Sequence, residues 1–175
     1  NAPSMLKAFG CTYSLVGHSE RRTLHAETDD VVAAKYEAIQ KGGLIPVLCI
    51  GETLAQFEAG TTNQVVETQL KAVIDRCGIA SFENAVVAYE PVWAIGTGLN
   101  ASPDNAQEMH RFCRTFIGDT FGQEVANHAL ILYGGSVKPE NARALMLEPD
   151  IDGLLIGGAS LSADAFSKIV NFQNL

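Results

Sequence analysis

The sequence predicts an α/β fold in which a parallel β-sheet is covered by helices. Strand-like and helix-like segments alternate along the chain as five βα units, and each strand-like segment leads into a glycine or a polar residue. The strand-like segments are continuous apolar runs, as is typical of parallel strands that are buried on both faces. Because 47% of the 175 residues are apolar and 18% are charged, residues 1–175 are expected to form one globular domain with a hydrophobic core.

The first two units are defined by apolar runs and by helix-ending residues. A β-rich run predicts a strand over residues 12–16. Apolar residues at helical spacing predict a helix over Asp29–Lys41, with Thr28 as its N-cap and two glycines at its end. The next apolar run predicts a buried strand over residues 44–50, and the amphipathic segment 61–76, which precedes another glycine, predicts a second helix.

The later units follow the same alternation. The apolar run at residues 85–89 predicts a strand. A long helix is expected to begin at Ser102-Pro103, with the serine as N-cap and the proline in the first turn, and to end near Phe121. The remaining segments are predicted as strand 129–133, helix 139–147, strand 151–156 and helix 162–170.

The number of units leaves two architectures open. An eight-stranded β/α barrel takes roughly 30 residues per unit, and this chain has about that length per unit but three units fewer. The chain is therefore expected to be either an open, doubly wound sheet or part of a longer sequence. The first residue, Asn1 rather than methionine, favours the second interpretation.

Composition excludes several classes of function. The formal net charge of −8 argues against nucleic-acid binding, which requires a basic surface. Neither an 18-residue apolar run nor a basic-then-apolar N-terminus occurs, so a membrane span and a signal peptide are not expected. The four cysteines are widely spaced and lack a CxxC pair, which predicts free thiols in a reducing compartment and hence a cytoplasmic protein.

Glu90 is the most informative candidate for catalysis. It ends the apolar run 85–89 and is followed by Pro91 and a glycine-rich segment that contains Trp93. The strand would hold the carboxylate in place as a base, and the loop would close over its target and exclude water. The alternative is an acidic residue at a strand end that is followed by an ordinary turn.

His18 occupies the equivalent position after the first predicted strand. If a helical turn begins at Ser19, the positive end of its dipole disfavours imidazolium, so the ring would stay neutral and donate a hydrogen bond. The alternative is a histidine that fills a loop. The other histidines have no comparable setting and are expected at the surface or in packing: His25, His110 and His128.

Two consecutive strand-to-helix turns, 134–136 and 157–158, are rich in glycine. Glycine lets the backbone approach an anion closely, and N–H groups at the start of a helix supply donors. In β/α barrels phosphate commonly binds after the last two strands, which is where these turns lie. They therefore favour a phosphate group as ligand, whereas the alternative is two tight turns that require glycine.

No metal and no cofactor are expected. The sequence has neither the His-x-His or HExxH spacing of metal sites nor a Walker A loop or GxGxxG fingerprint. Cys49 lies inside an apolar strand and is expected to be a core thiol rather than a nucleophile. The acidic segments Asp29-Asp30 and 148–150 are expected to be a solvated helix start and a loop.

Five segments closely resemble the triosephosphate isomerase family, and they occur in the family's order across nearly the whole chain. They are residues 15–22 (LVGHSERR), 46–52 (PVLCIGE), 88–98 (AYEPVWAIGTG), 133–139 (YGGSVKP) and 150–160 (DIDGLLIGGAS). The resemblance implies a (β/α)8 barrel, of which this chain would cover about strands 4–8. It also implies an enzyme that needs no cofactor and is normally a homodimer.

The reaction implied by the resemblance is an intramolecular aldose–ketose isomerisation. Dihydroxyacetone phosphate and D-glyceraldehyde 3-phosphate would interconvert through an enediolate, in glycolysis and gluconeogenesis. The partner is thus a small phosphorylated triose, with no nucleic acid or membrane. The family is a well-known case of a carboxylate base and a neutral histidine whose pKa values are set by their surroundings.

The family's functional residues map onto this sequence one by one. Glu90 would be the base, and His18 the neutral electrophile that polarises the substrate carbonyl. Residues 91–101 would form a lid whose tip, Ile95, meets Leu155. Phosphate contacts would come largely from backbone N–H groups at Gly96, Ser136, Gly157 and Gly158. Two neighbours of His18 would support its side of the site, Ser19 and Glu20.

The sequence departs from the family pattern at two places. The C-terminal hinge of the lid reads Leu99-Asn100-Ala101, whereas the family often has lysine at the first of these three positions. This change could alter the rate at which the lid closes. The larger departure is that the family's first three βα units have no counterpart here. Those units carry an Asn-x-Lys whose lysine meets the substrate's charge, and a long loop that docks into the partner subunit. Because that lysine is missing, the isolated chain is expected to be weakly active or inactive. Apolar surface meant for those strands would also be exposed, so the chain is expected to self-associate.

Two rival interpretations remain. Without the first-strand lysine, the chain would be a non-catalytic phosphate-binding or structural fragment that keeps both glycine-rich turns. The second rival is a different phosphate-binding barrel enzyme, such as an epimerase or indole-glycerol-phosphate synthase. An epimerase would need metal ligands at strand ends, and the pairing of His18 with Glu90 and a lid disfavours both enzymes.

Overall fold

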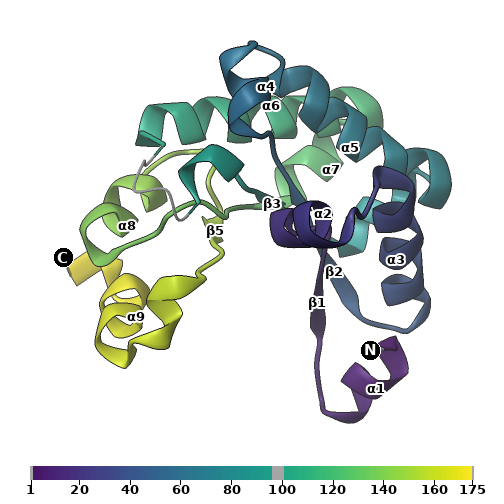
Figure 1. Ribbon diagram of the computed structural model, residues 1–175, viewed down its shortest axis with the longest axis horizontal. Helices are drawn as coiled ribbons and strands as arrows, with labels where there is room; N and C mark the ends of the chain where they lie inside the picture. The colour runs from purple at the N-terminus through teal and green to yellow at the C-terminus, as the bar shows by residue number, and fades with distance from the viewer. Residues whose placement is uncertain (1, 96–100, 175) are drawn as a thin grey trace.

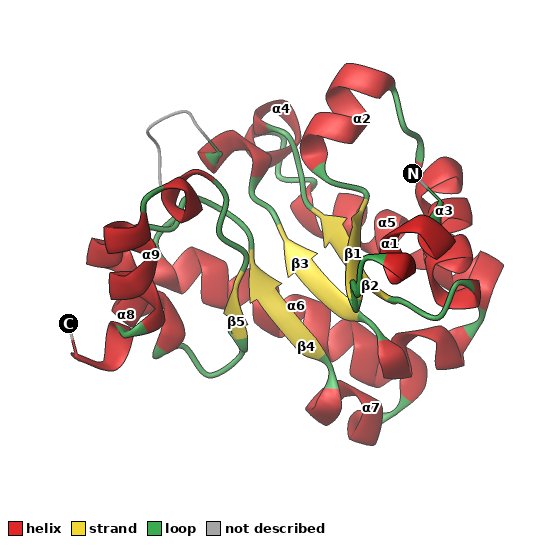
Figure 2. Ribbon diagram, turned by 90° about the horizontal axis from the view of Figure 1, so that it is seen from below, coloured by secondary structure: helices red, strands yellow, loops and turns green. Residues whose placement is uncertain are grey.

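The computed structural model describes residues 2–95 and 101–174, and its centre is a five-stranded parallel sheet (Figure 2). Every neighbouring pair of strands is parallel. The order of strands in the sheet is the order in the chain. A doubly wound sheet reverses its strand order at a switch point, whereas a barrel does not. The predicted α/β fold is therefore confirmed, in its barrel form. The strands are β1 (Tyr13–Val16), β2 (Ile45–Ile50), β3 (Val86–Tyr89), β4 (Leu130–Tyr133) and β5 (Gly153–Leu154).

The longer helices follow the strands as predicted and lie along the outside of the arc that the sheet forms (Figure 1). Thr28 caps the first of them, since its side chain accepts a hydrogen bond from the Val31 N–H at 3.4 Å. Ser102 caps the long helix in the same way, through the Asn105 N–H at 3.1 Å. These helices are α3 (Asp29–Lys41), α5 (Thr62–Cys77), α6 (Pro103–Phe121), α8 (Pro139–Met146) and α9 (Ala163–Val170).

Several elements differ from the sequence prediction. The last strand is restricted to Gly153–Leu154 rather than residues 151–156, because only these two residues pair in register with β4. Short helices also occur where the sequence predicted no helix or strand, since segments of this length show little periodicity. They are α1 (Pro3–Ala8), α4 (Leu54–Glu58), α7 (Gln123–His128) and the 3-10 helices η1 (Ile79–Asn84), η2 (Val92–Ala94), η3 (Gly158–Leu161) and η4 (Phe172–Asn174), while α2 (Ser19–His25) begins where a helical turn was anticipated.

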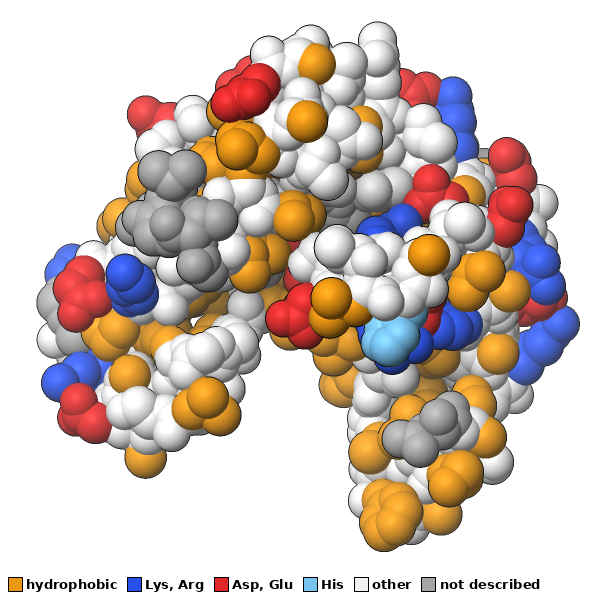
Figure 3. All heavy atoms as spheres, in the orientation of Figure 1, with side chains coloured by type: hydrophobic (Ala, Val, Ile, Leu, Met, Phe, Trp, Pro, Cys, Tyr) orange, Lys and Arg blue, Asp and Glu red, His pale blue; other side chains and the backbone are white. Residues whose placement is uncertain are grey.

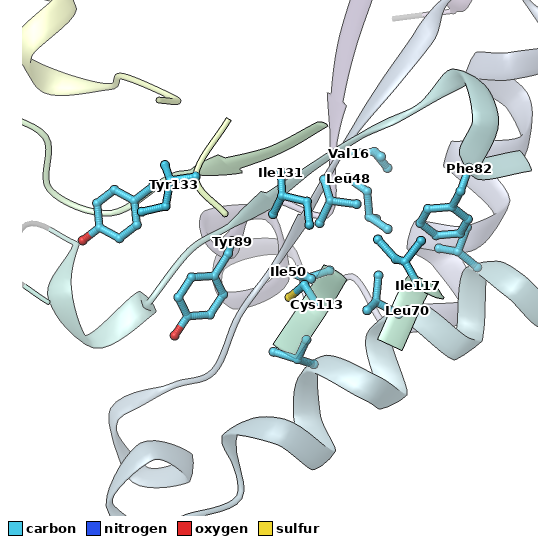
Figure 4. Packing of buried hydrophobic residues seen from close by; sticks show 14 of the residues in the cluster. Val16, Leu48, Ile50, Leu70, Phe82, Tyr89, Cys113, Ile117, Ile131 and Tyr133 are labelled. Carbon is cyan, nitrogen blue, oxygen red and sulfur yellow. The ribbon is translucent and has the colours of Figure 1, made fainter. Parts of the chain in front are cut away.

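The main core lies between the sheet and the outer helices (Figure 4). Along β2, Leu48 and Ile50 contribute to this core, whereas Val47 and Cys49 belong to a smaller cluster on the opposite face. The alternation follows the two-residue period of a strand. Both faces of the sheet are therefore apolar, as the continuous hydrophobic runs predicted. Helix residues complete the main core, among them Leu70, Cys113 and Ile117.

The concave side of the arc is open between α9 at one end and α1 with β1 at the other (Figures 1 and 3). Large apolar side chains are exposed at the second end, where Phe9 is 87% exposed and Tyr13 and Leu15 of β1 are about half exposed. Their exposure agrees with the expected uncovered apolar surface. Self-association of the chain through this surface stays a prediction.

Two compositional expectations concern cysteines and membranes. All four cysteines are free thiols: Cys11 is exposed, Cys77 is partly buried, and Cys49 and Cys113 are buried. No described helix combines the length and the apolar composition that crossing a bilayer requires.

Candidate active site

A cavity of about 540 Å³ lies at the carboxyl ends of the strands. Residues that follow β1, β3, β4 and β5 line it together, as the common edge of a parallel sheet predicts. Three of the predicted groups thus meet in one place: His18, Glu90, and the two glycine-rich turns. The apolar wall includes Leu15, Ile95 and Leu155.

Glu90 is held at the end of β3 with its carboxylate almost completely buried. The residue is 2% exposed, and its backbone N–H donates to the Ile50 carbonyl at 2.7 Å. One carboxylate oxygen, Oε1, lies 3.1 Å from His18 Nε2, and the other, Oε2, accepts a hydrogen bond from the Ser19 N–H at 3.1 Å. Burial raises the pKa of the Glu90 carboxyl, although the nearby His18 and the Ser19 N–H act in the opposite direction. A buried carboxylate with an elevated pKa is suited to take up a proton.

His18 is positioned by the turn between β1 and α2. Gly17 makes this turn at φ +77°, where an added Cβ would lie 2.9 Å from the Cys49 carbonyl oxygen. His18 is the N-cap of α2, and its Nδ1 accepts a hydrogen bond from the Glu20 N–H at 3.3 Å. Because Nδ1 is the acceptor, the ring proton is on Nε2, which faces Glu90. This tautomer is a neutral imidazole that donates a hydrogen bond into the cavity.

The first glycine-rich turn allows the chain to pass close beneath the site. A Cβ on Gly134 would lie 3.0 Å from Glu90 Cγ, and one on Gly135 would lie 2.2 Å from the Tyr133 hydroxyl. A side chain at Gly135 would therefore displace the buried Tyr133 ring, and one at Gly134 would be tightly packed against Glu90. At Gly157 and Gly158, by contrast, an added Cβ would meet no atom within 4 Å. The second turn therefore borders open space rather than packed protein.

Backbone donors are available along both turns. Within the described ranges, the N–H groups of Gly135, Ser136, Gly157 and Gly158 donate no hydrogen bond. The carbonyls of Ser136 and Gly157 already accept bonds, from the Asn141 side chain at 2.9 Å and from the Ser160 hydroxyl at 2.6 Å. Unused N–H donors beside a cavity favour an anionic ligand.

A second buried carboxylate lies behind the site and was not singled out from the sequence. Glu52 follows β2 and is fully buried; it accepts hydrogen bonds from Trp93 Nε1 at 2.7 Å and from the Tyr89 hydroxyl at 3.1 Å. Burial raises the pKa of the Glu52 carboxyl. Trp93 also stacks on Phe57 of α4, with ring centroids 4.4 Å apart. Glu52 thus anchors the segment that follows Glu90, and its position directly after a predicted strand was the available signal.

The remaining predicted residues have varied places. Ser19 contacts Glu90 and Glu20 contacts His18, both through backbone N–H groups. Gly96, and residues 96–100 of the predicted lid, lie outside the described residues. Burial raises the pKa of the Cys49 thiol well above its usual value, so the thiol is a poor nucleophile. No group of three potential metal-binding side chains occurs in the part of the chain that the structure describes.

The arrangement combines three chemical capabilities within one cavity. Glu90 can accept a proton, the His18 Nε2–H can stabilise negative charge that develops on an oxygen, and free backbone N–H groups can hold an anionic group. Such a set fits proton transfer next to the carbonyl of a small anionic substrate.

Comparison with known proteins gives a consistent result. A profile described as Triosephosphate isomerase matches residues 1–173. A protein of that name from Dechloromonas aromatica (strain RCB) is 59% identical over 173 residues, which cover 99% of this chain and 69% of that protein. A protein of the same name from Vibrio sp. (strain ANT-300) is 56% identical, and the match covers 98% of this chain and 68% of that protein. Another, from Psychromonas ingrahamii (strain DSM 17664 / CCUG 51855 / 37), is 59% identical, and the match covers 97% of this chain and 67% of that protein. The chain therefore spans about two thirds of the length of these relatives.

Proposed function

Because the chain belongs to the triosephosphate isomerase family, a family of isomerases, we propose that it carries the active site for interconverting dihydroxyacetone phosphate and D-glyceraldehyde 3-phosphate. The observation that carries this proposal is the pairing of the Glu90 carboxylate with a neutral His18 at 3.1 Å, in the same cavity as unused backbone donors. Residues 1–175 would form one domain, the later part of a barrel.

Glu90 and His18 divide the chemistry between them. Glu90 removes a proton from the hydroxyl-bearing carbon beside the carbonyl, and the carboxyl that forms, whose proton exchanges with water, then protonates the former carbonyl carbon. His18 Nε2–H donates to the carbonyl oxygen and stabilises the enediolate that forms. The ring gives this oxygen its proton and takes up the proton of the neighbouring hydroxyl, so the new carbonyl forms and the imidazole is neutral again. Glu90 and His18 contact each other in the structure, so a bound substrate would exchange that contact for contacts of its own.

The phosphate and the lid account for the rest of the site. The N–H groups of Ser136, Gly157 and Gly158 would hold the phosphate, with Gly96 joining them when the lid 91–101 closes. Ile95 and Leu155 both line the cavity and would meet on closure. A closed, dry site protects an enediolate from side reactions such as loss of phosphate. A cytoplasmic homodimer working in glycolysis and gluconeogenesis is part of the same proposal.

The first test is solvent proton exchange during turnover by the protein expressed from its complete gene. Incubation with dihydroxyacetone phosphate in D2O is expected to yield glyceraldehyde 3-phosphate with deuterium at the carbon that receives the proton. Proton NMR measures this incorporation. Unphosphorylated dihydroxyacetone is the control and should react far more slowly, because it lacks the phosphate group whose binding holds the substrate in the site. Binding of inorganic phosphate without conversion of either compound would overturn the proposal in favour of a non-catalytic phosphate-binding protein.

The pH dependence of kcat/KM is expected to reflect the Glu90 carboxyl. Since burial raises its pKa above 4.5, Glu90 becomes protonated, and activity is lost, as the pH falls through a midpoint higher than that of a solvent-exposed glutamate. The substrate phosphate also titrates in this range, so its pKa should be measured by phosphorus NMR and its contribution removed. Enzyme held at low pH and assayed at neutral pH controls for denaturation. A corrected profile that is flat down to pH 4.5 would contradict this role.

A further inference from the structure

The charge of the chain opposes the charge of the proposed substrate. The substrate's phosphate carries between one and two negative charges near neutral pH. The chain has a formal net charge of −8, and its cavity contains the Glu90 carboxylate. Long-range repulsion of this kind slows association and weakens binding unless a local positive charge offsets it.

Among the described residues that line the cavity, Lys138 alone carries a permanent positive charge. It follows Ser136 by two residues and directly precedes α8. Its backbone N–H donates to the Asn141 side chain at 2.8 Å, so its main chain, rather than its ammonium group, takes part in the turn. The side chain is exposed at the cavity rim, and none of the ion pairs within the described ranges includes it.

We propose that Lys138 is a substrate-binding residue whose ammonium group attracts the phosphate and holds it against the Ser136 and Gly157 turns. The inference rests on the proposed function and deepens it, since it assigns a positive charge at the glycine-rich turns, in addition to the lysine that the family carries on its first strand. Backbone N–H groups fix the position of a phosphate, but they carry only partial charges. A mobile lysine at the rim adds a full charge and reaches out to the approaching ligand.

The placement of Lys138 determines which kinetic constants it affects. Lys138 contacts the part of the substrate that does not react, so its interaction is the same in the ground state and the transition state. Interactions of this kind change KM and leave kcat nearly constant. Because the side chain is exposed, salt screens its effect over a distance of about 10 Å at 0.1 M ionic strength. The contribution of Lys138 should therefore be largest in dilute buffer.

The test compares Lys138→Gln, Lys138→Glu and Lys138→Arg with the unchanged protein expressed from its complete gene. Lys138→Gln should raise KM, and the Kd of inorganic phosphate measured by calorimetry, by about three- to tenfold at low salt, with kcat within about twofold. Lys138→Glu should have a larger effect, and Lys138→Arg should restore most of the binding. For the two variants that lack the positive charge, log(kcat/KM) should fall less steeply with salt concentration.

Lys71→Gln is the matched control, because it changes the net charge equally on the exposed face of α5, where Lys71 pairs with Glu67. It should leave KM and phosphate binding unchanged. The inference would be overturned if Lys138→Gln bound phosphate with the same Kd as the unchanged protein. It would also be overturned if Lys71→Gln weakened phosphate binding as much as Lys138→Gln does. Weaker phosphate binding in Lys138→Gln, in a protein that fails to isomerise the triose phosphates, would support the anion-binding role and refute the proposed function alone.

Discussion

Replacing Glu90 by glutamine is expected to lower kcat by about a thousandfold or more, since a positioned general base typically contributes 10²- to 10⁴-fold and this carboxylate is the proposed base for both proton transfers. Glutamine has nearly the same shape, and its side-chain oxygen can still accept the Ser19 N–H that Glu90 Oε2 accepts at 3.1 Å. The substitution therefore removes the base without emptying the site. A coupled assay in both directions measures the loss.

The same substitution should leave the free energy of unfolding unchanged or raise it. The folded-state pKa of Glu90 is raised, so the folded protein binds the proton more tightly than the unfolded chain. Its stability therefore falls as the pH rises through that pKa, and the ionised, buried side chain destabilises the fold at neutral pH. Glutamine removes this penalty, and urea denaturation measures the change. Catalysis and stability thus make opposite demands on this position.

Glu58→Gln provides the control for the Glu90 substitution. Glu58 is exposed on α4, and its replacement changes the net charge by the same amount. Activity within about twofold of the unchanged protein is expected, because surface substitutions away from a site have small effects. Retention of more than a tenth of kcat by Glu90→Gln would rule out Glu90 as the base.

The location of the candidate site follows from residue order alone. In a parallel sheet all carboxyl ends lie at one edge, so His18, Glu90 and the two glycine-rich turns were expected to meet without any knowledge of their contacts. The structure brings them to one cavity. The order of the five strands, in contrast, needed the structure, because apolar runs are the same in a barrel and in a doubly wound sheet.

The residues that support the site could not be predicted in this way. Glu52 contacts Trp93, 41 positions away, and Gln69 of α5 exchanges two hydrogen bonds with the Gly51 backbone across 18 positions. Such partners depend on how helices pack on the sheet, and no local pattern encodes them. Asp150 is a further example: its segment forms the predicted loop, but the sequence did not indicate that its carboxylate pairs with Arg114.

Replacing Arg114 by methionine is expected to destabilise the protein by roughly 3 kcal/mol, because removing one partner of a largely buried ion pair leaves charges and carbonyls unpaired. The guanidinium of this α6 residue lies 2.8 Å from Asp150 Oδ1 and 2.7 Å from Asp152 Oδ2, and its side chain is 16% exposed. It also donates to the carbonyls of Ala126 and Ala129 at 2.8 and 3.1 Å. One side chain thereby joins α6 to the end of α7 and to the segment that leads into β5.

Methionine retains the apolar stem of arginine, so the loss measured by urea denaturation reports mainly the missing charge and donors. The matched control is Lys168→Met in α9, which removes an exposed pair with Asp164 and should leave the free energy of unfolding nearly unchanged. Equal losses for the two variants would mean that the Arg114 contacts are no stronger than a surface ion pair. A large loss for Arg114→Met alone would show that β5, and the glycine-rich turn that follows it at Gly157, depend on a hydrogen-bonded cluster that lies outside the cavity. The position of the turn at Gly157, which is proposed to bind the phosphate, would then be set by α6, and Arg114→Met should also raise KM at temperatures where the protein is still folded.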